Sequence, residues 1–180
     1  LMVDRKDIYS KLVFGELPVS SWNKLIRRDF LKENSIDFYE GVIHEDVDFL
    51  YKLAAHVTSF ALCPVITYCY RVQREGSILS TTNDDRSTQS RILVYNACLD
   101  KKMKMPFRKL LTRSIFLRLI FVLQTAHVSH NLRYSFNTLC WRTVHEASGM
   151  DGFWMGLYLR APKFLKNRFY NLYSKKMKSL

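Results

Sequence analysis

The sequence predicts an α+β fold, with a mixed sheet and helices over residues 1–82 and a mainly α-helical region over residues 83–180. Two observations predict this division. The first part holds short apolar runs bounded by Pro, Gly and Asn, which have the length and composition of strands. From Asp84 onward, apolar residues recur at intervals of three and four, as on one face of a helix. We therefore place a domain boundary near residues 82–83.

The amino-acid composition restricts the class of protein to which this chain can belong. The 180 residues are 48% hydrophobic and 14% aromatic, which excludes a disordered chain and allows one domain, or one and a half, with a substantial core. The six glycines are scattered, so no Gly-rich phosphate loop follows a strand. If the protein handles nucleotides, the usual backbone cradle for their phosphates is not in this chain.

The elements of the first part are predicted in the order strand, helix, helix, strand, strand. Residues 22–26 are short and partly apolar, which suits a strand, and residues 28–34 suit one or two helical turns. A longer helix begins after Gly41, because Glu45, Asp46 and Asp48 suit its first turn and apolar residues then recur at helical spacing. Residues 58–62 and 65–72 are typical of two further strands.

The second part is predicted to be helical almost throughout. Four helices are expected, over residues 84–102, 107–126, 131–148 and 162–178. Residues 150–159 are apolar and aromatic, but glycines at 149, 152 and 156 are expected to break this stretch.

Positive charge is concentrated in this helical part. Residues 1–100 carry 12 basic and 14 acidic side chains, whereas residues 101–180 carry 16 basic and only two acidic ones, Glu146 and Asp151. Such an asymmetry indicates a polyanionic partner, namely nucleic acid, an anionic membrane surface or phosphorylated lipid, with a solvated basic face as the plainer alternative. In residues 160–178 basic side chains alternate with aromatic and aliphatic ones, which suits a helix on an anionic leaflet or one packed on the domain.

Cysteine usage and the start of the chain indicate a reducing compartment. The four cysteines form no C-x-x-C pair and no zinc-type set with histidine, so free thiols fit better than a single disulfide. The first seven residues lack the apolar core of a signal peptide, and the apolar run at 115–123 is too short to cross a bilayer. We expect a cytoplasmic protein, peripheral on the inner face of the plasma membrane if the basic tail binds lipid.

The most informative triplet is His44-Glu45-Asp46. Asp46 shares a helical face with apolar residues, so its carboxylate should point inward. An inward carboxylate in a partly dry cleft is a candidate general base. The alternative, favoured by spacing alone, is that these acidic residues only stabilise the helix dipole.

Two other segments offer binding groups. The loop after the last predicted strand carries two arginines and a serine, namely Arg71, Arg74 and Ser77. Guanidinium forks beside a hydroxyl suit a diphosphate, although an exposed loop with solvated charges is equally consistent. The other segment is Trp22-Asn23-Lys24. A tryptophan beside a polar pair can stack on a sugar ring, but an isolated strand tryptophan is more often part of the core.

These segments follow one another in a recognisable order. They are Trp22-Asn23-Lys24-Leu25, Phe30-Leu31, Ile36-Asp37-Phe38-Tyr39-Glu40-Gly41, His44-Glu45-Asp46, Tyr68-Cys69-Tyr70-Arg71 and Gly76-Ser77. In order and in gaps they resemble the second half of a family 2 glycosyltransferase. The resemblance covers roughly residues 15–82, and residues 83–180 resemble the helical tail that follows this domain in many bacterial members.

The resemblance implies a partial GT-A fold with a mixed sheet, and a sugar transferred with inversion from a nucleotide-sugar donor to a glycan or lipid-linked acceptor. It assigns Asp46 as the general base that deprotonates the acceptor hydroxyl, with Glu45 orienting the acceptor or Asp46. The remaining substrate-binding candidates are Trp22, Asn23, Lys24, His44, Arg71, Arg74 and Ser77, the last three near the donor diphosphate.

One feature of the family has no counterpart in this chain. Family members hold the donor diphosphate through a divalent metal, Mg²⁺ or Mn²⁺, on a D-x-D motif in a preceding half, and no such motif precedes Trp22. Asp46-Val47-Asp48 matches the letters, but it lies on a helix after the Glu-Asp pair, and we interpret it as coincidence. We expect an acceptor-side half that is inactive in isolation and self-associates through the open edge of its sheet.

Two hypotheses about function follow. The first is part of an inverting glycosyltransferase that helps to build a surface polysaccharide or a lipid-linked glycan. The alternative is a basic helical module that binds nucleic acid or a membrane without catalysis. Nucleic acid is the less favoured partner because no recognised nucleic-acid motif accompanies the charge.

Overall fold

The computed structural model describes residues 4–71, 85–100, 107–125, 128–147, 149–162, 165–166 and 170–171. Within these ranges all regular structure is helical, with seven α-helices and one short 3₁₀ helix. In chain order they are α1 (Arg5–Val13), η1 (Ser21–Asn23), α2 (Arg28–Glu33), α3 (Glu45–His56), α4 (Asp85–Leu99), α5 (Arg108–Thr125), α6 (His130–Glu146) and α7 (Met150–Arg160).

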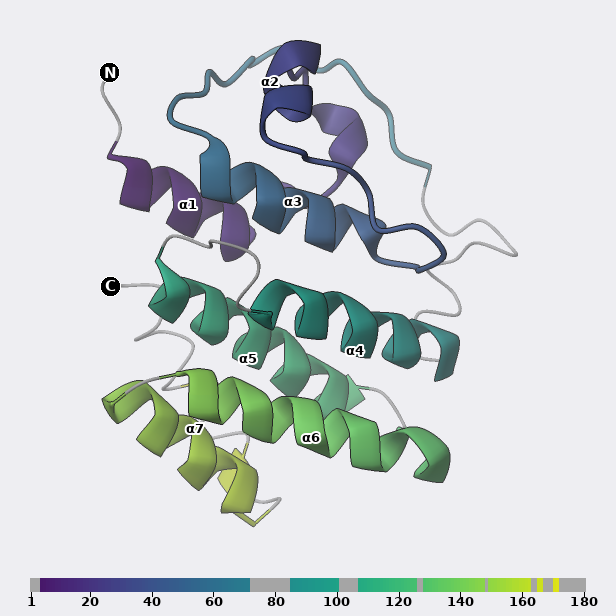
Figure 1. Ribbon diagram of the computed structural model, residues 1–180, viewed down its shortest axis with the longest axis vertical. Coiled ribbons are helices and arrows are strands. Elements are labelled where there is room, and N and C mark those ends of the chain that lie inside the picture. The colour runs from purple at the N-terminus through teal and green to yellow at the C-terminus, as the bar shows by residue number, and fades with distance from the viewer. Residues whose placement is uncertain are drawn as a thin grey trace.

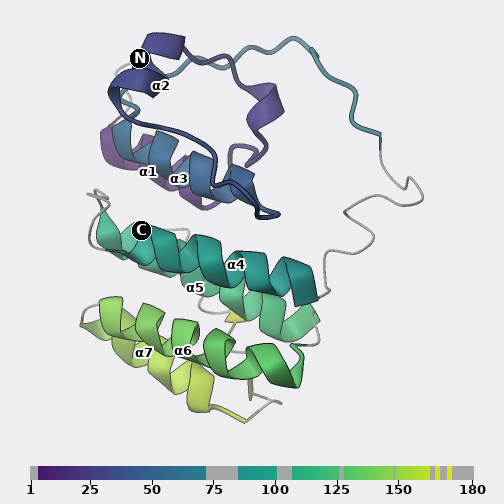
Figure 2. The same ribbon diagram turned by 45° about the vertical axis from the view of Figure 1, so that its right-hand side comes forward.

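The helices stack in three layers along the long axis of the molecule (Figure 1). α1 and α3 form the first layer, α4 and α5 the second, and α6 and α7 the third, and the turned view shows the same order (Figure 2). α3 packs on α4 and α1 on α5, while α6 contacts α4, α5 and α7. η1, α2 and the segment 57–71 lie on the outer side of the first layer (Figure 1).

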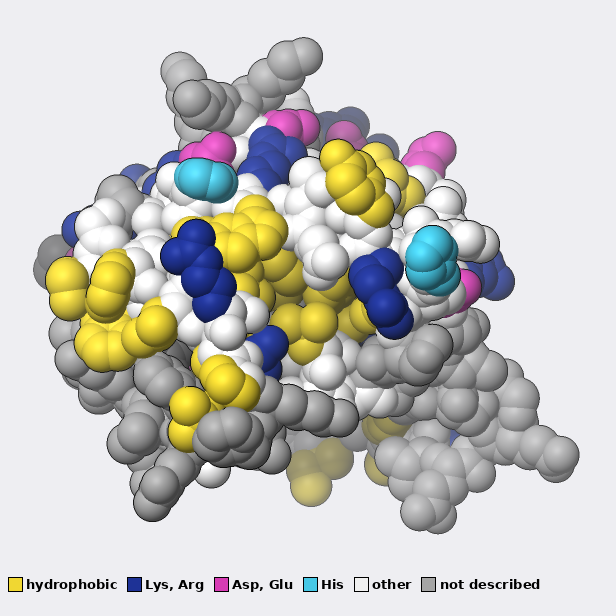
Figure 3. Space-filling view, turned by 90° about the horizontal axis from the view of Figure 1, so that it is seen from below, with side chains coloured by type: hydrophobic (Ala, Val, Ile, Leu, Met, Phe, Trp, Pro, Cys, Tyr) yellow, Lys and Arg dark blue, Asp and Glu magenta, His cyan; other side chains and the backbone are white. Residues whose placement is uncertain are grey.

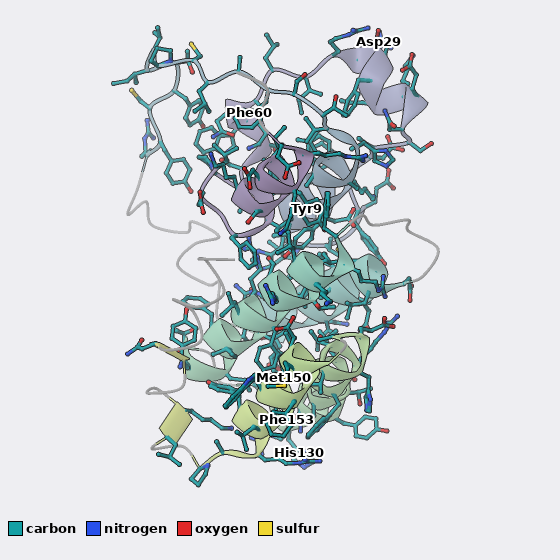
Figure 4. The ribbon with its side chains drawn as sticks, turned by 90° about the vertical axis from the view of Figure 1, so that its left-hand side faces the viewer. Tyr9, Asp29, Phe60, His130, Met150 and Phe153 are labelled. Atoms are coloured by element: carbon teal, nitrogen blue, oxygen red, sulfur yellow. The ribbon has the colours of Figure 1, made fainter. Side chains whose placement is uncertain are left out.

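The first layer forms because apolar side chains recur at helical spacing. The buried residues of α1 are Ile8, Tyr9, Leu12 and Val13. They share one face, and the carboxylate of Asp4 accepts a hydrogen bond from the backbone N–H of Lys6 at the start of the helix. Tyr9 is fully buried and lies where the first layer meets the second (Figure 4). There its ring centroid is 5.4 Å from that of Phe107.

One hydrophobic core connects the layers. Its buried members include Tyr9 of α1, Leu50 of α3, Val94 of α4, Leu111 of α5 and Leu139 of α6. The domain boundary expected near residues 82–83 lies outside the described residues, and the division into two domains stays a prediction. The described residues on the two sides of that boundary share this core.

The helices predicted from strong periodicity are confirmed. The predictions over 84–102, 107–126 and 131–148 correspond to α4, α5 and α6, with ends that differ by a few residues. The short helix expected over 28–34 is α2, and the longer one expected after Gly41 is α3, which begins at Glu45. Of the helix expected over 162–178, residues 162, 165–166 and 170–171 are described; residue 162 is not helical, and the other four are.

The predicted α+β fold, with its partial GT-A-like sheet, is wrong. Residues 21–23 form a 3₁₀ turn where a strand was expected, and residues 58–71 are irregular throughout. Val65 and Ile66 are mostly exposed, so this segment does not bury the face that a sheet would cover. A strand needs a neighbour for its N–H and C=O groups, and the described chain offers only helices there. A short apolar run in the sequence does not indicate whether a neighbouring strand exists.

Two helices were missed. No element was assigned to the residues of α1, and the stretch that forms α7 was expected to be broken by its glycines. Gly149 does precede α7 with a φ of 68°, as a break would require. Gly152 and Gly156 instead lie within the helix, on the side that packs against α6.

Candidate functional site

An aromatic platform, made of Trp22, Tyr68 and Tyr70, lies on the outer side of the first layer. The Trp22 and Tyr68 rings stack with centroids 4.0 Å apart, and the Trp22 and Tyr70 rings with centroids 5.6 Å apart. Each of the three side chains is about half exposed. The structure therefore joins the Trp22 segment to the Tyr68-Cys69-Tyr70 segment in one partly exposed aromatic cluster.

Lys24 fixes the loop that carries Trp22 of the aromatic platform. Its Nζ donates to the backbone oxygens of Pro18 and Ser20, at 2.5 and 2.7 Å, and to Oδ1 of Asn23 at 2.8 Å. These three acceptors match the three donors of an ammonium group. Burial lowers the pKa of Lys24, and the charge of Asp46 opposes that shift. Lys24 and Asn23 thus shape the loop, and Lys24 lies within electrostatic reach of Asp46.

Asp46 lies in the first turn of α3 and is partly buried. Burial raises its pKa, and the neighbouring charge of Glu45 raises it further, while the Val47 N–H and Arg118 oppose the shift. A carboxylate with a raised pKa takes up a proton more readily than an ordinary aspartate does. This property suits a general base. Glu45 is exposed beside it.

The segment that leads into α3 is anchored on α4. His44 has left-handed backbone angles, φ 74° and ψ 26°, immediately before the first turn. Its Nε2 lies 2.8 Å from Oγ of Ser87, and the N–H of Ile43 donates to Oγ of Ser90 at 3.1 Å. Such backbone angles are uncommon outside glycine. These two serine contacts fix the start of α3 and with it the position of Asp46.

The metal implied by the family resemblance finds no suitable ligands at Asp46-Val47-Asp48. Asp48 is fully buried, and its Oδ2 lies 2.6 Å from Nζ of Lys52, four residues later on α3. Its Oδ1 also lies 4.0 Å from Sγ of Cys98. Asp48 therefore has a structural role in the core. Among the described residues, no three His, Cys, Asp or Glu side chains lie close enough together to hold a metal ion.

A cavity of about 440 Å³ lies on the other side of this region, between α1, α3, α4 and α5. Its lining residues are Val13, Phe14, Gly15, Val19, His44, Val47, Arg91, Tyr95, Ser114, Leu117, Arg118, Phe121 and Tyr170. Burial alone would lower the pKa of Arg118, but the charges of Tyr51, Tyr95 and Asp46 raise it overall. Arg118 thus couples the cavity electrostatically to Asp46.

The remaining predicted site residues are Arg71, Arg74 and Ser77. Arg71 is exposed at the end of a described stretch, and Arg74 and Ser77 lie outside the described residues. Sequence reasoning missed Arg91 and Arg118. The one available signal was the position of Arg118 inside an otherwise apolar run at 115–123, where a charge needs a polar surrounding.

Comparison with known proteins adds no assignment. No protein-family model matches the chain, and neither a curated protein nor a solved structure is significantly similar to it. The resemblance to family 2 glycosyltransferases therefore rests on the sequence motifs alone. Among the described helices, none combines the length and the apolar character that crossing a membrane requires.

Proposed function

We propose that this chain forms the acceptor side of an inverting glycosyltransferase, which transfers a sugar from a nucleotide-sugar donor to a glycan or lipid-linked acceptor. The observation that carries the proposal is the aromatic platform close to Lys24, whose ammonium is coupled to the raised-pKa carboxylate of Asp46. The proposal rests on this site and not on the fold, because unrelated folds support the same chemistry.

The chemistry follows from the two groups. Trp22 and its stacked tyrosines offer apolar ring faces for the C–H faces of a sugar. Asp46 accepts the proton of the acceptor hydroxyl while that oxygen attacks the anomeric carbon of the donor. The bond from that carbon to the nucleoside diphosphate breaks, and its electron pair leaves on a phosphate oxygen. Arg71, Arg74 and Ser77 remain the proposed contacts of that diphosphate, and a divalent metal held elsewhere would assist it.

The first test replaces the proposed base. In the full-length product of the gene that encodes this chain, Asp46→Asn is expected to lower kcat by about 10²–10⁴-fold with unchanged helix content, the usual contribution of a positioned base. Asp7→Asn is the matched control because it removes a carboxylate charge by the same substitution from the first turn of another helix, α1, at an exposed position. Turnover by Asp46→Asn equal to that of the control would contradict the assignment.

The alternative, a basic helical module without catalysis, draws on the charge of the second half. Part of that charge is already paired, because Arg108 lies 2.7 Å from Glu146, Arg113 lies 2.9 Å from Asp151, and Arg142 lies 2.6 Å from Asp100. These ion pairs neutralise part of the positive charge that would attract nucleic acid, and they therefore weaken the nucleic-acid hypothesis. A salt-dependent shift of RNA or DNA in a gel by the intact chain would restore it.

A membrane surface is the better supported anionic partner. The exposed apolar residues of α7 are Met150, Phe153, Trp154 and Leu157. Their spacing places them along one stripe of the helix. From this end of the molecule, apolar side chains gather beside Lys and Arg side chains (Figure 3). We infer a peripheral contact with an anionic leaflet, which sedimentation with anionic but not neutral vesicles would support.

A further inference from the structure

Residues 58–71 cross the outer side of the first layer as an exposed, extended segment (Figure 2). The last backbone hydrogen bond before this segment runs from the N–H of Val57 to the oxygen of Leu53, at 2.9 Å. Within the part of the chain that the structure describes, no backbone hydrogen bond reaches residues 58–71. Their N–H and C=O groups are therefore available to a second extended chain, as they are on the edge of a sheet.

The second half of this segment already has the geometry of a strand. Tyr68 and Tyr70 are two residues apart, and both rings stack on the same partner, Trp22. Side chains at that spacing share a face in an extended chain. Residues 65–70 also consist mainly of β-branched and aromatic types, which favour β-structure. Backbone geometry and composition thus both suit this segment to pairing with another strand.

The exposed surface of the segment is apolar and uncharged. Leu62, Val65 and Ile66 are 72, 67 and 87% exposed, and no Asp, Glu, Lys or Arg occurs in residues 58–70. Edge strands that must not pair are commonly protected by lysine or proline, and here Pro64 alone interrupts the row of N–H groups. An uncharged stretch does not attract a polyanion, so nucleic acid and an anionic leaflet are poor partners for it.

A second copy of this chain fits the segment better. Residues 4–71 carry nine basic and ten acidic side chains, so the first layers of two copies do not repel each other. In an antiparallel pair related by a two-fold axis, each copy supplies the N–H and C=O groups that the other needs. We propose that residues 62–70 of two copies pair in this way and form a two-stranded ribbon with Ile66 at the two-fold axis.

The register follows from exposure and from Pro64. Ile66 is the most exposed large apolar side chain of the segment, so two molecules approach each other there with the least steric overlap. If Ile66 faces its own counterpart in a non-hydrogen-bonded pair, Pro64 also occupies a non-hydrogen-bonded position, where its missing N–H is not needed. The same register brings Cys63 of one copy opposite Cys69 of the other, at a Cα separation of about 5.5 Å.

The ribbon places the aromatic platforms of both copies on the same face. A two-fold axis perpendicular to the ribbon preserves the faces of the two strands, and the Tyr68 residues of the two copies are then about 13 Å apart along it. A ligand of repeating units, such as a glycan, can contact both platforms. That consequence rests on the proposed function, whereas the pairing of the two copies does not.

Sedimentation velocity of the intact chain over a range of concentrations tests the association. A monomer–dimer equilibrium is expected, and Ile66→Lys is expected to raise the dimer dissociation constant at least tenfold, because it places two like charges opposite each other. Leu93→Lys is the matched control, because it introduces the same charge at an exposed apolar position of α4 in the second layer. A monomer at millimolar concentration, a series of larger oligomers, or a dimer that Ile66→Lys leaves unchanged would overturn the proposal.

Disulfide trapping tests the direction and the register of the pair. After mild oxidation with diamide, Cys63→Ser alone and Cys69→Ser alone are each expected to run as monomers on a non-reducing gel. An equal mixture of the two variants is expected to give a covalent dimer, because a Cα separation of about 5.5 Å suits a disulfide. Cys98 and Cys140 are buried and do not compete. Covalent dimers of either variant alone, or none in the mixture, would contradict the proposed pairing.

Turnover separates this pairing from the glycosyltransferase proposal. If Asp46→Asn retains full turnover while Ile66→Lys still weakens the dimer, the glycosyltransferase proposal fails and the pairing stands. If Asp46→Asn loses turnover while Ile66→Lys leaves the dimer unchanged, the pairing alone is overturned.

Discussion

Asp46 is the proposed catalytic base, and its partly buried charge also lowers the stability of the folded state. Burial and the charge of Glu45 raise its pKa, so the folded protein binds the Asp46 proton more tightly than the unfolded chain does. The charged carboxylate present at neutral pH is therefore less favourable in the folded state. Groups that oppose stability in this way are frequent at functional sites, because function and not folding determines their surroundings.

This penalty predicts the pH dependence of stability in Asp46→Asn. The penalty in the unsubstituted protein develops as pH rises through the ordinary aspartate pKa of 3.8 and is complete above the raised folded-state pKa. Urea unfolding is therefore expected to show equal stability of the two proteins at pH 3. At pH 7 Asp46→Asn is expected to be more stable than the unsubstituted protein. This comparison first needs a correction for the interaction with the helix dipole, which the substitution also removes.

This correction uses Asp7→Asn, which removes an exposed carboxylate from the first turn of α1. Both substitutions weaken the interaction with a helix dipole, by about 0.3–1 kcal/mol, but only Asp46→Asn relieves the burial of a charge. A lower urea midpoint for Asp46→Asn than for Asp7→Asn at pH 7 would contradict the raised pKa.

Single residues also show what sequence reasoning could reach. Asp46 was found from its place in a helical first turn and its apolar neighbours, because both properties are local. Arg118 was missed as a site residue, although it is a charge inside an apolar run. Its relation to Val13 and Asp46, far away in the chain, depends on how α1 and α3 pack on α5. Packing partners of that kind are not encoded in the local pattern.

Among the elements, α7 depends on two glycines that have different surroundings. A Cβ atom at Gly152 would overlap the backbone oxygen of Ala147 and lie 3.0 Å from that of Val144. A Cβ atom at Gly156 would meet only side-chain atoms of Val144 and Trp141, at 3.7 and 3.8 Å. The first contact is a steric conflict with backbone that cannot easily move, and the second is ordinary packing.

The two alanine substitutions are therefore expected to differ in sign. Gly152→Ala should destabilise the protein by about 1–3 kcal/mol, because α7 must shift away from the end of α6. Gly156→Ala should be neutral or stabilising by up to about 1 kcal/mol, because alanine favours a helix over glycine. Thermal unfolding of the two variants measures the difference, and equal destabilisation would show that α7 does not pack on α6 through this face.

The elements also explain which parts of the fold could be predicted. α4, α5 and α6 have 15, 18 and 17 residues, long enough for a helical period to be recognised. The strands predicted over 58–62 and 65–72 are wrong in their described residues, 58–62 and 65–71, because a short apolar run has the same composition whether or not a neighbouring strand exists. α7 was misread because glycine disfavours a helix intrinsically, whereas here Gly152 allows close approach to α6.

At the scale of the whole molecule, α5 connects the layers. Ser114 of α5 donates to the backbone oxygen of Val13, at 2.5 Å, and lies 2.8 Å from the Tyr51 hydroxyl. On its other side, Arg113 forms two hydrogen bonds with Asp151 of α7, at 2.9 and 3.0 Å. The shared core and these bonds indicate that the three layers unfold together and not one by one.

The native cysteines test this cooperativity without any substitution. Cys98 of α4 and Cys140 of α6 are buried, whereas Cys63 and Cys69 are exposed on the segment outside the first layer. Burial raises the pKa of both buried thiols, that of Cys140 to about 12, so each reacts with an alkylating reagent only after the surrounding structure opens. The exposed pair provides the reaction rate of an accessible thiol in the same sample.

Alkylation by iodoacetamide, followed by peptide mass spectrometry at increasing urea, gives an opening free energy for each thiol. A cooperative molecule is expected to give Cys98 and Cys140 the same opening free energy and the same urea dependence, both equal to those of global unfolding. The reason is that both belong to the one core that Tyr9, Leu50 and Leu139 also share. A markedly lower value for Cys140, with little urea dependence, would show that α6 and α7 open separately. In that case the third layer would be an independent unit, able to bind a membrane without disturbing the site at Asp46.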